Sequence, residues 1–176
     1  MNIPVILILG FVTLLPAAAG ETAGGVPTNA PATISLRDQF DAPQTLAFPT
    51  TNVLFFAIAD QKGSEQIAGW VAPVKDRFQE RVAIYGIADV SAVPRPLRGL
   101  VRKKFKQAQS HPVMLDWTGT TVKAFGCANN AVNVFVVDGE GGIQMRVVGP
   151  ATEGKLRDLF AVLDQTLGRK DHVVAK

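Results

Sequence analysis

The sequence contains few of the residue types that most often carry chemistry in small proteins. Its 176 residues include one cysteine, Cys127, two histidines and one tyrosine. A single cysteine excludes a disulfide within the chain and a dithiol that cycles between oxidised and reduced forms. The histidines, His111 and His172, are too far apart in sequence to form a recognisable metal motif. We therefore expect no metal ion and no cofactor.

Other functional signatures are also missing. The formal net charge of +3 is too small an excess to indicate a nucleic-acid partner. No Gly-x-Ser-x-Gly motif supports a hydrolase. The glycine-rich residues 139–142 lie between two apolar runs and are typical of a hairpin turn, not of a phosphate-binding loop.

The N-terminus has the pattern of an export signal. Residues 3–15 form an apolar run, and small residues follow at 16–20, which predicts a signal peptide over residues 1–20. The run is shorter than the ~20 residues that span a bilayer, although an uncleaved anchor is the alternative. We therefore expect a periplasmic or secreted protein.

The rest of the chain divides into three parts. Residues 21–33 are small and polar with two prolines, which predicts a flexible linker. Residues 34–168 are long enough for one domain with a buried core, and residues 169–176 read as a polar tail.

Within the domain, strand and helix patterns alternate. The apolar run at 52–59 predicts a strand covered on both faces. Alternation with helices predicts parallel pairing, and a terminal hairpin adds an antiparallel edge, giving an α/β fold with a mixed central sheet. The remaining expected elements are helices at 64–80, 96–109, 118–125 and 152–167, and strands at 81–89, 112–116, 133–138 and 143–148.

The chain resembles the thioredoxin-like superfamily, specifically its redoxin and peroxiredoxin-related branch. The resemblance rests on this order of elements, on the segment at 36–43 (LRDQFDAP) and on the hairpin at 134–141 (VFVVDGEG). The resemblance covers residues 34–167 and implies a three-layer α/β/α domain. The stretch KGSEQ at 62–66 also resembles exported thioredoxin-like proteins that have no assigned activity.

The resemblance places the reactive cysteines of that superfamily where the first long strand meets its helix. Here that corner, residues 60–64, reads Asp60, Gln61, Lys62, Gly63 and Ser64. None of these side chains can exchange disulfides. A nucleophilic cysteine preceded by proline and threonine, as in peroxidase relatives, is also missing between residues 55 and 69.

A second departure lies just before the hairpin, where relatives carry a cis-proline. Val132 takes that position here. Because a cis bond before a residue other than proline costs several kcal/mol, we expect a trans peptide.

The polar corner supports two interpretations. Lys62, together with the free N–H groups of the helix start, could hold an anionic ligand. Alternatively, Ser64 caps the helix while Asp60 and Glu65 complement its dipole. Asp116 and Trp117 end the third strand, where open α/β sheets often build sites, although we expect Trp117 mainly to pack over the core edge.

Cys127 also supports two interpretations. It could be a thiol that senses peroxide or links a partner, activated by Lys123 or Lys62. Alternatively, it is a small, inert and partly buried side chain, since free cysteines are among the most buried residues.

One predicted helix is strongly basic. Four of its cations fall on one helical face, which we expect to be solvated or to make weak contact with an anionic surface. We expect four apolar residues on the opposite, inward face. The cations are Arg95, Arg98, Arg102 and Lys106, and the apolar residues are Leu97, Leu100, Val101 and Phe105.

Taken together, these patterns favour a non-catalytic binding module for an unidentified protein or small-molecule partner. The alternative is a divergent redoxin with peroxidase or thiol-disulfide activity through Cys127.

Overall fold

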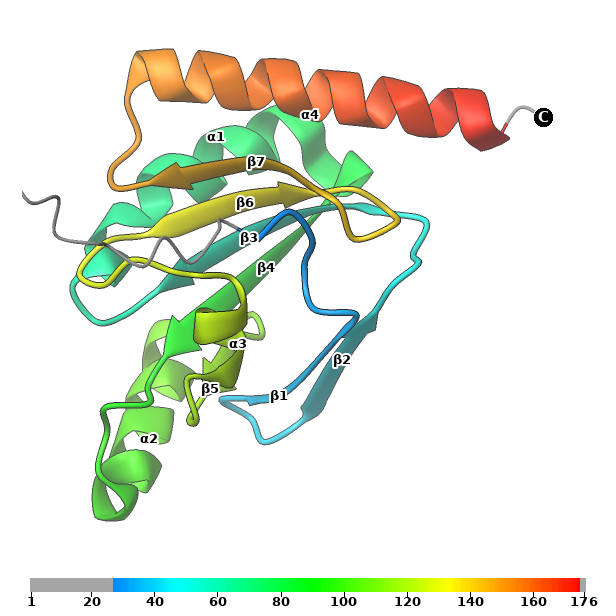
Figure 1. The fold of residues 1–176 in the computed structure, drawn as a ribbon. Coiled ribbons are helices and arrows are strands. Elements are labelled where there is room, and N and C mark those ends of the chain that lie inside the picture. The colour runs from blue at the N-terminus through cyan, green and yellow to red at the C-terminus, as the bar shows by residue number, and fades with distance from the viewer. Residues whose placement is uncertain (1–26, 175–176) are drawn as a thin grey trace, which may run out of the picture.

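The computed structural model describes residues 27–174, which form a seven-stranded mixed sheet with helices on both faces (Figure 1). The predicted signal peptide and residues 21–26 lie outside this range. The strand order is β2-β1-β5-β4-β3-β6-β7. The strands are β1 (Thr33–Asp38), β2 (Pro43–Ala47), β3 (Val53–Ala59), β4 (Val82–Asp89), β5 (Met114–Asp116), β6 (Asn133–Val137) and β7 (Ile143–Val148). The helices are α1 (Ala68–Phe78), α2 (Arg98–Ala108), α3 (Thr120–Ala124) and α4 (Glu153–Val174), and short 3-10 turns, η1 (Gly63–Gln66) and η3 (Arg95–Leu97), precede α1 and α2.

Strand β3 runs through the interior of the domain, and every one of its residues is apolar and buried. It pairs in parallel with β4 and antiparallel with β6, and β4 pairs in parallel with β5. The hairpin of β6 and β7 forms one antiparallel edge of the sheet. The predicted mixed sheet and its α/β class are thereby confirmed.

Alternate side chains of β3 build two separate cores. Phe55 packs toward α1 and α4, where it meets Trp70 and Leu159. Phe56 points to the other face and packs with Phe125 just after α3. Helices α1 and α4 therefore cover one face of the sheet and α3 covers the other, which completes the three layers.

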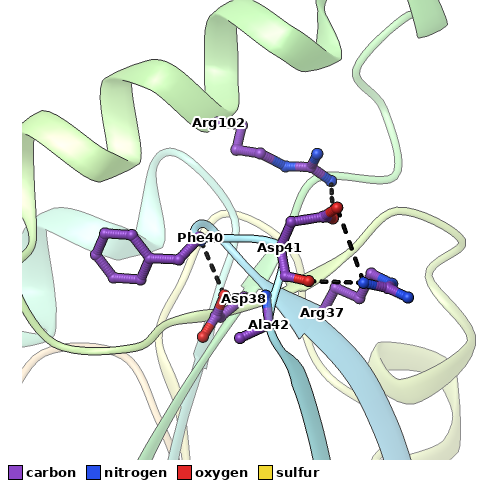
Figure 2. A network of polar contacts seen from close by, with 6 residues as sticks. All are labelled: Arg37, Asp38, Phe40, Asp41, Ala42 and Arg102. Carbon is purple, nitrogen blue, oxygen red and sulfur yellow. Dashed lines mark hydrogen bonds and ion pairs between the residues drawn. The ribbon is translucent and has the colours of Figure 1, made fainter.

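The opposite edge of the sheet is a second hairpin, in a segment (residues 33–46) where the sequence predicts only a short extended piece and a turn at 41–43. Strand β1 pairs with β2 and with β5, antiparallel in both cases. In the turn between β1 and β2, Asp38 accepts hydrogen bonds from the N–H groups of Phe40 and Ala42 (Figure 2). Asp41 forms ion pairs with Arg37 and with Arg102 of α2. This turn therefore ties the sheet edge to α2.

Both ends of the domain extend further than expected. Residues 27–32 belong to the predicted linker, but Ala30 is buried and donates its N–H to the carbonyl of Gly141 at 2.8 Å. Thr28 accepts from the N–H of Ile143 at 2.8 Å. At the other end, α4 runs to Val174, through most of the predicted tail. The ordered domain is thus longer than the predicted 34–168.

Candidate functional site

The predicted corner forms where β3 ends, and Asp60 organises it. One carboxylate oxygen of Asp60 accepts the N–H of Gly63 at 2.8 Å. The other accepts the N–H of Asn130 at 2.6 Å, from the loop before β6. Asp60 therefore bridges the start of η1 and the opposite loop.

These two segments lie close together. A Cβ on Gly63 would fall 2.4 Å from the carbonyl carbon and oxygen of Ala131, so only glycine fits there. Next to it, Gln66 Oε1 accepts the N–H of Val132 at 3.3 Å. Among residues 27–174 the single cis peptide is Phe48–Pro49, so the bond before Val132 is trans, as expected. Val132 is fully buried and belongs to the core, which removes it from the predicted contact surface.

Two N–H groups at the helix start are already hydrogen-bonded within the chain. The N–H of Gly63 bonds to the Asp60 carboxylate, and the N–H of Ser64 bonds to the Asp60 carbonyl at 3.0 Å. Ser64 Oγ donates to the carbonyl of Gln61 at 2.7 Å, so it does not cap the helix. The Asp60 carboxylate, and not the Ser64 hydroxyl, accepts the first N–H of η1. Gln61 and Lys62 are exposed.

Cys127 lies beside this corner. It lines a small cavity of about 10 Å³ together with Asp60, Asp89 and Asn133. Burial raises the pKa of the Cys127 thiol to about 12, Arg146 opposes that rise, and Asp89 adds to it. The thiol is therefore protonated at neutral pH.

Activation of Cys127 by a lysine, which belongs to the first of the two interpretations, finds no support in its surroundings. The charges that act on the thiol come from Arg146, Asp89 and Asp116, and not from Lys62 or Lys123. Since the thiolate is the reactive form of cysteine, this environment favours the inert interpretation.

Asp116 has a structural task. It is fully buried and accepts hydrogen bonds from the N–H groups of Thr118, Gly119, Thr121 and Val122 at 2.8 to 3.1 Å. The hydroxyl of Thr118 adds another at 3.0 Å. These are the unpaired donors at the start of α3, so Asp116 fixes that helix and has no capacity left for a ligand.

The basic helix is turned differently from the prediction. Arg98 lies over the Trp117 ring, 5.1 Å from its centre, and donates to the Trp117 carbonyl at 3.3 Å. Arg102 lies 6.0 Å from the same ring and pairs with Asp41 at 3.3 Å. Both arginines therefore face the body of the protein and are half-buried. The prediction for Trp117, packing at the core edge, agrees with these contacts.

Of the four apolar residues expected on the inward face of the basic helix, two are half-buried and two are exposed. Val101 and Phe105 are half-buried, whereas Leu97 and Leu100 are 50% and 54% exposed. The predicted buried face is therefore wrong for both leucines. Of the four predicted surface cations, Arg95 and Lys106 are exposed.

A further hollow, of about 500 Å³, lies between α1 and α4 and was not predicted. Leu156 and Phe160 line it, and an ion pair of 2.9 Å joins Arg77 to Asp164 at its side. The residues come from helices far apart in sequence, so no local motif could reveal it.

Two features are absent from the described residues. Within residues 27–174, no three His, Cys, Asp or Glu side chains group in a way that could hold a metal ion. No helix in this range combines the length and apolar character needed to cross a bilayer.

Comparison with solved structures identifies the fold. A thiol:disulfide interchange protein of the thioredoxin family from Chlorobium tepidum has a TM-score of 0.55 at 21% identity, covering 80% of this chain and 97% of that one. The exposed lipoprotein thioredoxin Etrx1 of Streptococcus pneumoniae scores 0.59 at 12% identity, over 76% and 99% of the two chains. StoA of Bacillus subtilis scores 0.57 at 14% identity, over 76% and 99%.

The fold is therefore thioredoxin-like. No family model and no curated protein matches the sequence. At these low identities the structural likeness establishes the architecture and not the activity.

Proposed function

We propose that this protein is an exported thioredoxin-like domain that binds a partner without catalysing redox chemistry. The observation that carries the proposal is the position of Asp60. A thiolate at a helix start is stabilised by the N–H groups and the helix dipole. Here the carboxylate of Asp60 accepts hydrogen bonds from the N–H groups of Gly63 and Asn130, so the N–H of Gly63 is already occupied.

Cys127 gives little support to the alternative, a redoxin that works through one thiol. Its pKa of about 12 leaves almost no thiolate at neutral pH. The exposed side chains of Gln61 and Lys62 are the groups at the corner that a protein or small-molecule partner would meet. The apolar N-terminal run supports export, and the likeness to an exposed lipoprotein thioredoxin is consistent with it.

The test is a pair of activity assays on the wild-type protein and on Cys127→Ser. We expect both proteins to match the buffer blank in insulin reduction with dithiothreitol and in hydrogen peroxide consumption. A thioredoxin with its two cysteines serves as the positive control. Turnover by the wild type that disappears in Cys127→Ser would refute the proposal and establish the redoxin alternative.

A further inference from the structure

Helix α2 presents an apolar centre to solvent. Leu97 and Leu100 are 50% and 54% exposed, more than the other exposed large hydrophobic residues, Phe40 and Val148. A spacing of three residues places the two leucines side by side on one face. Figure 1 shows α2 projecting at the end of the domain remote from α4. These leucines therefore stand on a convex surface that the rest of the domain leaves uncovered.

Two exposed lysines lie next to these leucines. Lys103 and Lys104 lie three and four residues after Leu100 on the same side of the helix, and both are exposed. We call Leu97, which ends η3 and directly precedes α2, together with Leu100, Lys103 and Lys104, the outer face of α2. Arg98 and Arg102 do not belong to it, because they turn inward to Trp117.

The charge of this region has one sign. Residues 90–115 contain no aspartate or glutamate. The one described carboxylate that pairs with α2, Asp41, bonds to the inward Arg102. Among the described residues, no salt bridge involves Lys103 or Lys104. The lysines of the outer face are thus free to meet an external anion.

We propose that the outer face of α2 docks on the surface of an anionic phospholipid bilayer. Lysines with long apolar stems hold phosphate headgroups while adjacent leucines enter the boundary of the acyl chains. The two hollows described above lie elsewhere, beside Cys127 and between α1 and α4. A convex helix with an aliphatic centre and a cationic rim fits a flat, deformable surface better than the shaped pocket of an acidic protein. This inference goes beyond the proposed function and holds whether or not the protein is catalytic.

The test uses a local fluorescent probe in the full chain. A Cβ at Gly99 of α2 or at Gly168 of α4 would meet nothing within 4 Å, so both positions accept a label. Gly99→Cys and Gly168→Cys are each made in a Cys127→Ser background and labelled with acrylodan. Each is then mixed with vesicles of phosphatidylcholine alone or of equal phosphatidylglycerol and phosphatidylcholine.

We expect a blue shift of the label at position 99 only on the vesicles with phosphatidylglycerol, and no shift at position 168. Adding Lys103→Glu and Lys104→Glu should weaken the apparent affinity by about thirtyfold or more, because each basic residue near an anionic surface contributes about fivefold to the affinity. The matched pair Lys75→Glu and Arg157→Glu, both exposed on other helices, should leave it unchanged.

Several results would overturn the proposal. These are an unshifted label at position 99, equal shifts at both positions, equal shifts on neutral and anionic vesicles, or indifference to reversal of the two lysines. Binding of an acidic protein with no response to vesicles would assign the outer face to that other kind of partner and would equally refute the bilayer.

Discussion

Two carboxylates at the ends of central strands accept hydrogen bonds from backbone N–H groups and thereby hold segments of the chain together. Asp60 joins the first residue of η1 to the loop before β6, and Asp116 accepts hydrogen bonds from the N–H groups at the start of α3. From sequence, such residues are indistinguishable from ligand-binding groups, because position at a strand end is common to both roles. Their hydrogen bonds to N–H groups decide the question, and those bonds exist only after folding.

Because Asp116 accepts the N–H groups at the start of α3, we expect its removal to lower the stability of the protein strongly. Asp116→Ala would leave several buried N–H groups at the start of α3 without a partner, since the carboxylate is fully buried. We expect the free energy of unfolding to fall by about 2–4 kcal/mol, measured by urea denaturation. Asp158→Ala removes an exposed carboxylate from α4 and should change it by less than ~0.5 kcal/mol. Equal effects of the two substitutions would contradict the role given to Asp116.

At Cys127 the prediction concerns pH. The folded-state pKa of about 12 lies above the ordinary value of 9.0. The rate of alkylation by iodoacetamide should therefore rise about tenfold per pH unit from pH 7 past pH 10, whereas in denaturant it should level off near pH 9. A folded-state rate that levels off below pH 9 would contradict the assignment.

The same shift has a consequence for stability. Because the unfolded chain ionises at a lower pH than the folded one, the thiol favours folding below pH 9 and loses that contribution between pH 9 and 12. Comparing the wild type with Cys127→Ser across this range isolates the effect.

At the scale of elements, the close approach of η1 to the loop before β6 is set by Gly63. Gly63→Ala would place a Cβ 2.4 Å from the backbone of Ala131, so one segment must move. We expect a loss of about 1–3 kcal/mol in urea unfolding. Gly168→Ala, in open space on α4, should be neutral or stabilising by up to ~1 kcal/mol. An unaffected Gly63→Ala variant would show that the two segments separate without cost.

Sequence patterns predict the central elements well and the orientation of α2 poorly. Strand β3 is recognisable because an unbroken apolar run can only be buried, and the β6–β7 hairpin because glycines separate two apolar runs. Strand β2 alternates exposed and half-buried residues at a sheet edge, which leaves a weak signal. For α2, polarity suggested that Arg98 and Arg102 face water. Contact with the Trp117 ring reverses that, and no local pattern encodes a contact 15 to 19 residues away along the chain.

At the scale of the whole molecule, the two cores share one sheet, so they should unfold together. Leu159 is fully buried between α4 and β3, and Leu159→Ala should lower the free energy of unfolding by about 2–5 kcal/mol. Trp70 reports on that face and Trp117 on the region of α2. Within each single-tryptophan variant, Trp117→Phe or Trp70→Phe, we expect the fluorescence of the remaining tryptophan and the far-UV circular dichroism to show coincident urea transitions. Separate transitions would mean that the faces unfold independently.

The bridge formed by Asp60 also limits how this scaffold could be converted into an oxidoreductase. Installing thiols through Gln61→Cys and Ser64→Cys would place them beside a resident negative charge that already holds the N–H of Gly63. Such a neighbour raises a thiol's pKa and slows its attack at neutral pH. An engineer would have to replace the aspartate first, and in doing so would release the loop around Asn130 that it secures.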